Sequence, residues 1–113
     1  MNLNPALIIS ALSGAIYVIT GWLMQRYPPK KINDLCGYRT KRSKKSQEHW
    51  EFAQIESAKH LKQAGYYCLL SCAPYMLLEF DVSHIWTAIS FVTLIPFISI
   101  IQTEKALKNR FEV

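Results

Sequence analysis

The sequence predicts an all-α membrane protein with three transmembrane helices and an amphipathic helix in the loop between the first and second. Three observations predict this fold. Hydrophobic residues make up 50% of the 113 positions, the stretches 1–25, 63–78 and 82–103 contain no charged residue, and Lys and Arg gather in 26–62. A soluble amphipathic helix keeps a polar face along its whole length. The pattern therefore disfavours a soluble enzyme, a disordered chain and a secreted disulfide scaffold.

Each uncharged stretch is expected to cross the bilayer as a helix, because a hydrocarbon core of about 30 Å needs roughly 20 apolar residues. The predicted spans are 5–24, 61–80 and 84–102. Pro5 suits a helix start, and Pro96 is expected to bend the third span, provided that a neighbour satisfies the carbonyl it frees. The second span needs Lys62 to reach the headgroups, and Pro74 is expected to kink it. Two spans with an interfacial helix, or a soluble bundle, are the alternatives.

The Lys and Arg side chains also predict the orientation. Ten of the 13 lie between the first and second spans, and the other three follow the third span. The turn at 79–84 has none and carries Glu79 and Asp81. The positive-inside rule then places the protein in the cell membrane with the N-terminus outside and the loop and C-terminus inside. A cleaved signal peptide is disfavoured, because residues 1–25 have no positive segment.

Small residues recur every four positions in two of the spans. They are Ala6, Ser10 and Gly14 in the first and Ala64, Cys68 and Cys72 in the second. Such faces let helices approach closely in lipid, within a three-helix bundle or between copies in a homo-oligomer. No Cys or His spacing typical of a metal site is present, so the cysteines are expected to be structural, and no metal or cofactor is expected.

Residues 25–60 are expected to form the cytosolic loop. Its first part is irregular, as Pro28 and Pro29 indicate. Ser43 and Ser46 are candidate N-caps for a helix in its second part. On that helix Trp50, Ala53, Ser57 and Leu61 fall at helical spacing. We expect an amphipathic helix on the membrane surface, anchored at the interface by Trp50, that continues or turns into the second span.

A basic run in this loop is expected to face anionic lipid. Each such residue contributes about 1 kcal/mol near a charged leaflet. Nucleic-acid binding is disfavoured, because the loop has no recognisable binding fold. The expected lipid-facing residues are Lys41, Arg42, Lys44 and Lys45.

The loop also carries an ordered set of residues that resembles the signature of the SdpI/YfhL family. The set is Lys31-Ile32-Asn33, Gly37-Tyr38-Arg39-Thr40, Ser43, Ser46, Trp50 and Ala53. The resemblance covers about 23 residues of the loop, and the hydropathy is similar over almost the whole chain. It implies a single three-span membrane domain over 1–113, of bacterial type. The longer members of the family have additional N-terminal spans.

The resemblance also implies a function. In one member of the family it is immunity to a secreted peptide toxin that attacks the membrane, with signalling through a transcriptional repressor held at the membrane, and most members have no assigned role. A peptide toxin and a cytosolic regulator are therefore expected partners beside the lipid bilayer. The alternative is a structural or accessory protein that binds anionic lipid or a membrane partner through its basic loop. No nucleophile–base pair at usable spacing is present, so an enzyme is not expected.

Four loop residues form the candidate ligand or headgroup site. Gly37 can take a positive φ in a tight turn. Arg39 and Thr40 offer a forked guanidinium and a hydroxyl for a phosphate or carboxylate. Asn33 is expected to bridge loop backbone groups. The other interpretation is structural: the same residues fold the loop back against the membrane and the bundle, with Thr40 as a helix cap.

Overall fold

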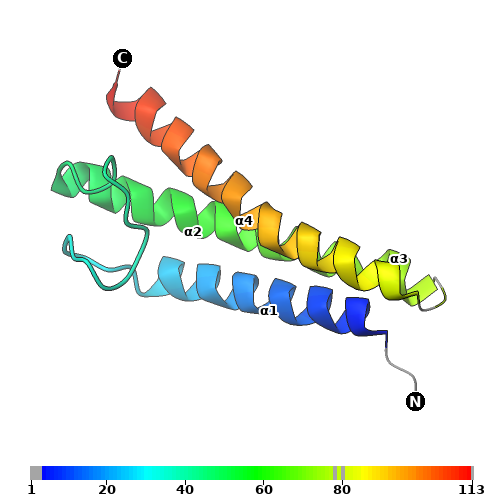
Figure 1. Cartoon of the computed structure of the whole chain (residues 1–113). Helices are drawn as coiled ribbons and strands as arrows, with labels where there is room; N and C mark the ends of the chain where they lie inside the picture. The colour runs from blue at the N-terminus through cyan, green and yellow to red at the C-terminus, as the bar shows by residue number, and fades with distance from the viewer. Residues whose placement is uncertain (1–3, 78, 80, 113) are drawn as a thin grey trace.

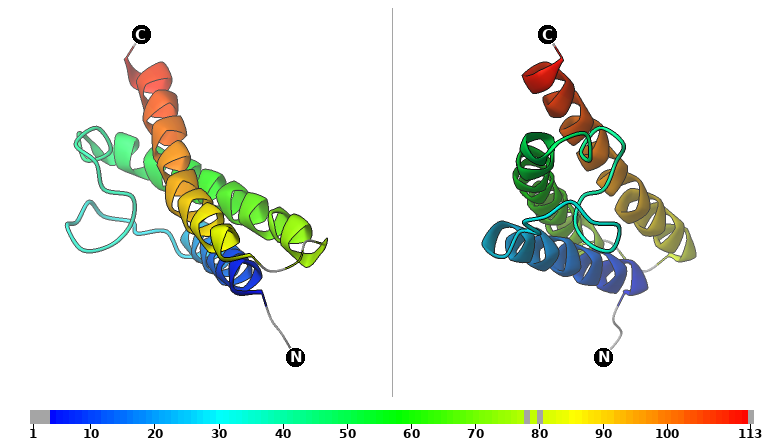
Figure 2. Two further views of the ribbon diagram at one scale, coloured as in Figure 1. Left: turned by 45° about the vertical axis from the view of Figure 1, so that its right-hand side comes forward. Right: turned by 90° about the vertical axis from the view of Figure 1, so that its left-hand side faces the viewer.

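The computed structural model describes residues 4–77, 79 and 81–112, and helices dominate these residues. They are α1 (Pro5–Arg26), α2 (Gln47–Leu70), the short α3 (Cys72–Leu77) and α4 (Val82–Phe111). α1, α2 and α4 form one elongated bundle, and the long α1–α2 connection folds over one end of it (Figure 1). We call this the loop end. The beginning of α1 lies at the opposite end, near α3 (Figures 1 and 2).

α1 agrees with the expected first span. The Asn4 side chain caps it by accepting a hydrogen bond of 2.9 Å from the Ala6 N–H, and Pro5 occupies the first turn. Proline fits there because the first N–H groups of a helix have no partner within it. The helix ends at Arg26, just before Pro28 and Pro29.

α2 is one continuous helix across the expected boundary between the surface helix and the second span. Ser46 caps its start by accepting a hydrogen bond of 3.2 Å from the His49 N–H, as one of the two cap candidates predicted. The helix then runs to Leu70 without a turn. It breaks at Ser71, one turn before Pro74, whose ring leaves no room for the carbonyl four residues earlier. Positions 78 and 80, at the end of the expected second span, lie outside the described residues.

α4 contains the expected third span and extends nine residues past it, to Phe111. Asp81 caps its start, accepting a hydrogen bond of 3.1 Å from the Ser83 N–H. Pro96 lies within the helix, so the carbonyl of Val92 has no helical N–H to accept from. The Tyr17 hydroxyl of α1 donates to that carbonyl at 2.7 Å. The condition under which a membrane helix tolerates such a proline is therefore met, and the expected bend stays a prediction.

The small-residue faces form the contact between α1 and α2, as predicted. A Cβ atom at Gly65 would lie 2.6 Å from the Val18 backbone nitrogen and 2.8 Å from the Gly14 carbonyl oxygen. Ala6, Ser10, Ala64, Cys68 and Cys72 are buried as well. Helices in lipid gain from such close backbone approach, because apolar burial adds little there. Gly65 itself was not among the predicted contact residues.

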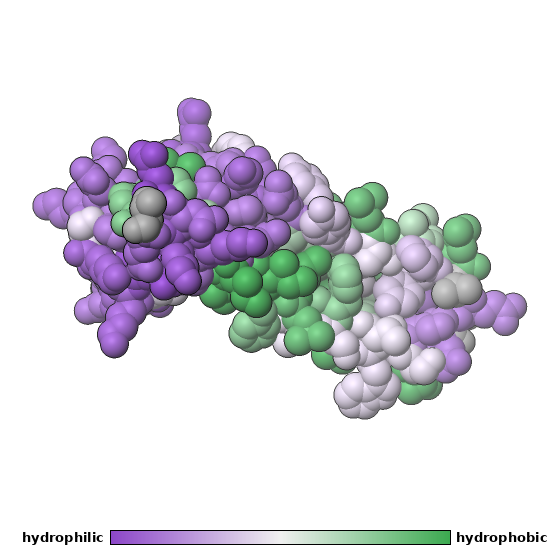
Figure 3. All heavy atoms as spheres, turned by 90° about the horizontal axis from the view of Figure 1, so that it is seen from above, coloured by the Kyte–Doolittle hydropathy of each residue, from purple (hydrophilic) through white to green (hydrophobic). Residues whose placement is uncertain are grey.

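Large apolar side chains point outward, as in a membrane protein. Leu12 and Ile16 on α1 and Leu94 and Ile101 on α4 are each about 60% exposed or more. α1 and α4 are long and apolar enough to cross a bilayer, each with a mean hydropathy of 1.9. Figure 3 shows hydrophilic surface gathered at the loop end and hydrophobic surface beyond it. α2 has a charged first half, and the second span expected at 61–80 stays a prediction.

Candidate functional site: the docked loop

The loop between α1 and α2 is organised by local turns that its sequence predicts. The Asn33 side chain accepts hydrogen bonds from the backbone N–H groups of Leu35 and Cys36, and donates to the Lys31 carbonyl. Gly37 has a φ of +95°. A Cβ atom there would lie 2.6 Å from Gln54 Oε1. Both the bridging role of Asn33 and the positive φ of Gly37 are confirmed.

A buried glutamine of α2 fixes the loop next to this turn. Gln54 Oε1 accepts a hydrogen bond of 2.8 Å from the Tyr38 N–H, and Gln54 Nε2 donates to the Tyr38 carbonyl at the same distance. The amide thus satisfies both backbone groups of Tyr38, as a neighbouring β-strand would. Gln54 is only 1% exposed, so removing its side chain would leave buried polar groups unsatisfied.

Trp50 lies inside this arrangement and not at an interface with lipid. Its side chain is fully buried, and its indole N–H donates to the Pro29 carbonyl at 2.7 Å. The helical stripe that contains Trp50, Ala53 and Ser57 is buried. Protein covers this stripe in the structure, and an amphipathic helix on the membrane surface stays a prediction. An aromatic anchor in lipid would leave Trp50 exposed.

Thr40 and Ser43 close a tight turn at the end of the loop. Ser43 Oγ accepts from the Thr40 N–H at 2.8 Å, and Thr40 Oγ1 accepts from the Ser43 N–H at 3.1 Å. Ser43 is fully buried. Neither residue caps α2, whose cap is Ser46. Instead, the turn directs the Thr40 hydroxyl away from the loop and toward α4.

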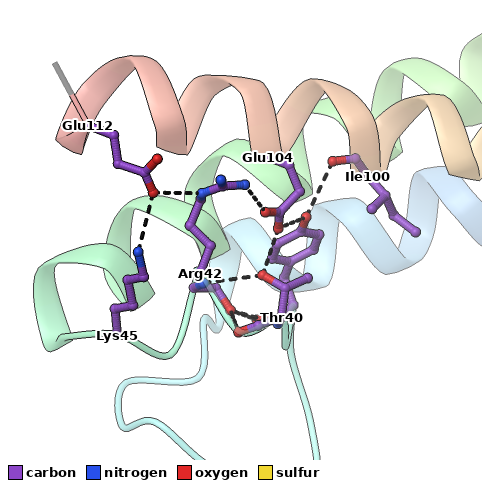
Figure 4. Close-up of polar contacts among 8 residues, drawn as sticks. Thr40, Arg42, Lys45, Ile100, Glu104 and Glu112 are labelled. Carbon is purple, nitrogen blue, oxygen red and sulfur yellow. Dashed lines mark hydrogen bonds and ion pairs between the residues drawn. The ribbon is translucent and has the colours of Figure 1, made fainter.

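Glu104 of α4 receives three side chains from the loop. Tyr38 Oη and Thr40 Oγ1 each donate to Glu104 Oε1 at 2.6 Å. An Arg42 nitrogen donates to Glu104 Oε2 at 2.8 Å. Figure 4 shows Thr40 and Arg42 meeting Glu104 on one side of α4. We call Tyr38, Thr40, Arg42 and Glu104 the Glu104 cluster. It ties the loop to α4, which is long and apolar enough to cross a bilayer.

A second carboxylate near the end of α4 extends the contact. Glu112 Oε1 accepts a hydrogen bond of 2.9 Å from Arg42 Nε and lies 3.3 Å from Lys45 Nζ (Figure 4). Arg42 therefore bridges the two glutamates with its forked guanidinium. Phe111 also stacks on His49 of α2, with ring centroids 4.0 Å apart. The extension of α4 beyond the expected span thus packs against the loop and α2.

The electrostatics of the cluster favour an ionised Glu104. Partial burial alone would raise the pKa of Glu104, but hydrogen bonds from Thr40, Tyr38 and Arg42 outweigh burial and lower it. Partial burial, and then the hydrogen bond to Glu104, raise the pKa of Tyr38 above its ordinary value. Tyr38 therefore remains a protonated donor and Glu104 a charged acceptor, the combination that gives short, strong hydrogen bonds.

The structure divides the predicted site residues into two groups. Thr40 and Gly37 belong to the docked part of the loop. Arg39 is exposed, and its guanidinium donates to the Asp34 carbonyl, away from the Glu104 cluster. Ligand or headgroup binding by these residues stays a prediction.

The basic run is divided in the same way. Arg42 and Lys45 contact the acids of α4, and Lys44 pairs with Asp34 at 3.1 Å. Lys41 is exposed and forms no ion pair among the residues that the structure describes. In this structure Lys41 thus keeps the free, outward position expected of a lipid-facing residue, whereas Arg42 is used within the protein.

Sequence reasoning missed Gln54, Glu104 and Glu112. A signal for Glu104 was present, because it is the first charged residue after the third uncharged stretch. A loop rich in hydroxyls and basic groups needs a carboxylate acceptor if it is to dock. Gln54 gave no comparable signal, because a glutamine on a helix is most often exposed.

The geometry defines a class: an all-helical membrane protein with a basic loop fastened to its last helix. The model of the SdpI/YfhL protein family matches residues 30–104, a range that ends at Glu104. The chain belongs to this family.

One curated relative is the uncharacterized protein YfhL of Bacillus subtilis (strain 168). It is 39% identical to this chain over 54 residues, which make up 48% of this chain and 49% of the relative. The matched part thus spans about half the length of that protein. No solved structure matches the chain.

Proposed function

We propose that this chain is a multi-pass membrane protein that confers resistance to a membrane-active peptide toxin. Membership of the SdpI/YfhL family supports the proposal, since the loop signature resembles that of immunity proteins. The observation that carries it is the Glu104 cluster. This cluster makes the signature loop one structural unit with a membrane helix. A peptide that disturbs the helices therefore also disturbs the loop, which gives the loop a means of signalling to a regulator.

The proposal includes a topology. α2 and α3 together supply the second span, and the loop and the end of α4 lie on the cytosolic side. The support is the excess of Lys and Arg at the loop end, which the positive-inside rule assigns to the cytosol. The ion pairs of Arg42 with Glu104 and Glu112 require the loop and the end of α4 to share one side.

A survival assay tests the proposal. Toxin-sensitive cells express the chain at matched membrane levels and are challenged with the peptide toxin. The wild type is expected to protect. Arg39→Ala is expected to lose protection if Arg39 binds the ligand, and Lys41→Ala is the matched control for loss of an exposed positive charge. Absence of protection by well-inserted wild type would refute the immunity function for that toxin.

A second function rests on a different observation. Of the Lys and Arg residues in 25–62, only Arg42, Lys44 and Lys45 have ion-pair partners among the described residues. The remaining positive charge suits an accessory protein that binds anionic lipid or a membrane partner through its loop. This function predicts binding to anionic vesicles that depends on salt, with no protection against toxin.

A further inference from the structure

A cavity of about 400 Å³ lies beneath the docked loop. Three helices and the loop line it. Its apolar walls come from Met24 of α1, Leu61 of α2, and Pro96 and Ile100 of α4, and Gly37 of the loop lines it as well. Pockets for small ligands measure roughly 300–1,000 Å³. The cavity is therefore large enough for one flexible apolar chain.

The cavity exists because α1 and α4 separate toward the loop end. The hydrogen bond from Tyr17 to the Val92 carbonyl joins the two helices near their middles. Beyond it they diverge, and the loop crosses the space between them (Figures 1 and 2). Thr20 and Ile100 line the cavity and are exposed, so it opens between α1 and α4. Because both are spanning helices, this opening faces the bilayer.

Four of the five hydroxyl groups in the cavity wall are already used within the protein, and the fifth, that of Thr20, lies at the exposed opening. Thr103 Oγ1 donates to the Ser99 carbonyl at 2.8 Å, and Ser99 Oγ donates to the His60 carbonyl at 3.2 Å. Ser57 Oγ donates to the Gln54 carbonyl at 3.3 Å, and the Tyr38 hydroxyl donates to Glu104. These four hydroxyls thus have no hydrogen left to donate to a ligand. A polar occupant would replace few of the hydrogen bonds that it loses to water, so the wall favours an apolar one.

Two arginines lie next to lining residues in the sequence. Arg26 follows the lining residue Met24 by two positions, and Arg39 directly follows the lining residue Tyr38. Among the described residues, neither arginine forms an ion pair. On the face shown in Figure 3, the hydrophilic surface of the loop end adjoins hydrophobic surface. An occupant with an apolar chain and an anionic head would match both features.

We propose that this cavity binds one acyl chain of an anionic phospholipid, with the headgroup phosphate held at the basic loop near Arg26 and Arg39. The lipid then fills the space that the divergence of α1 and α4 leaves under the loop. Anionic lipid would consequently favour the docked loop, because it binds both the cavity and the loop. The proposal does not depend on resistance to a toxin.

Photolabelling tests the proposal. The full chain is reconstituted in vesicles of phosphatidylcholine with a trace of phosphatidylglycerol that carries a diazirine near the end of one acyl chain. The same diazirine chain on phosphatidylcholine serves as the matched probe. Peptide mapping by mass spectrometry then locates the label. We expect label at 20–24, 57–61 and 96–103, with the phosphatidylglycerol probe preferred.

Two neighbouring residues provide a matched pair of variants. Ile100→Trp puts a larger side chain into the cavity, and its labelling is expected to fall roughly tenfold, equivalent to about 1.4 kcal/mol. Ile101 is 65% exposed and does not line the cavity. Ile101→Trp is therefore expected to label like the wild type. Circular dichroism verifies that both variants keep their helices, and if Ile100→Trp misfolds, Met24→Trp takes its place.

Three results would overturn the proposal. Label spread evenly over the outward faces of α1 and α4 would indicate ordinary contact with surrounding lipid. Equal labelling by the two probes would remove the role of the anionic head. Labelling of the cavity by an apolar photoreactive peptide, with none by the lipid probes, would assign it to a peptide instead.

Discussion

Glu104→Gln is the substitution that most directly tests how the loop is held. The glutamine side chain has nearly the same size as glutamate, so the packing around position 104 of α4 is preserved. The change removes the negative charge that accepts hydrogen bonds from Tyr38 and Thr40 and pairs with Arg42. It also replaces one acceptor oxygen by an amide that donates. We expect the loop to detach more often while the helices remain folded.

The magnitude follows from the two hydroxyl donors. A hydrogen bond to a charged group contributes about 1.5–3 kcal/mol, and one between neutral groups about 0.5–1.5 kcal/mol. Each of the two bonds, both 2.6 Å long, therefore loses about 1 kcal/mol. The ion pair with Arg42 is left out of this figure because solvent screens it. Loop docking should weaken by about 2 kcal/mol, which corresponds to roughly a 30-fold larger open fraction.

Hydrogen exchange measures the open fraction directly. The amide of Tyr38, which donates to Gln54, and the amide of Thr40, which donates to Ser43, report on docking. Both should exchange roughly 30-fold faster in Glu104→Gln, whereas amides in the middle of α1 should not change. Glu112→Gln is the matched control. It also removes a carboxylate that contacts Arg42, but at an exposed position where pairing contributes little.

Two outcomes would refute this reasoning. Unchanged exchange at Tyr38 and Thr40 in Glu104→Gln would mean that the carboxylate does not hold the loop. Equal acceleration in Glu112→Gln and Glu104→Gln would mean that general charge attraction holds it, and not the short hydrogen bonds of the Glu104 cluster.

Three further predictions concern the turn, the helix contact and pH. Gln54→Leu should destabilise the loop by about 1–3 kcal/mol, since the Tyr38 N–H loses its acceptor and the Tyr38 carbonyl loses one of its two donors. Exchange at the Tyr38 amide measures this loss. Gly65→Ala should lower the midpoint of thermal unfolding in detergent, because the new Cβ atom would meet the backbone of Gly14 and Val18. Overpacking of this kind costs about 1–3 kcal/mol of stability. An unchanged midpoint would contradict this close contact. The pKa of Glu104 is lower in the folded protein than its ordinary value of 4.5. The docked loop should therefore keep its full stabilisation above pH 4.5 and lose it as the pH falls below that value. Exchange at the Thr40 amide should show this decline in the wild type and not in Glu104→Gln.

Features that depend on near neighbours in the chain were predictable from the sequence. The start of α1 at Pro5, the cap at Ser46 and the positive φ of Gly37 follow from preferences of single residues or short motifs. The small-residue contact between α1 and α2 was also predictable, because a spacing of four places residues on one helix face. Family membership rested on the same local spacing and is confirmed.

The roles of Trp50 and Arg42 could not be predicted from neighbouring residues in the sequence. Both residue types suit a membrane surface, and the sequence pattern alone favours that position. In the structure Trp50 is buried against the Pro29 carbonyl, and Arg42 bridges two carboxylates of α4. Both side chains have the chemistry that the pattern implies, but the groups that they contact belong to distant parts of the sequence.

The sequence by itself determined the helices, the two most apolar spans and the local turns of the loop, because neighbouring residues set backbone preference and hydropathy. Only the tertiary structure decided that Thr40 meets Glu104, 64 residues away, and that a cavity lies under the loop. Both depend on how far α4 extends and on where it diverges from α1. The register and angle between packed helices arise from side chains of all three at once, so no single segment specifies them.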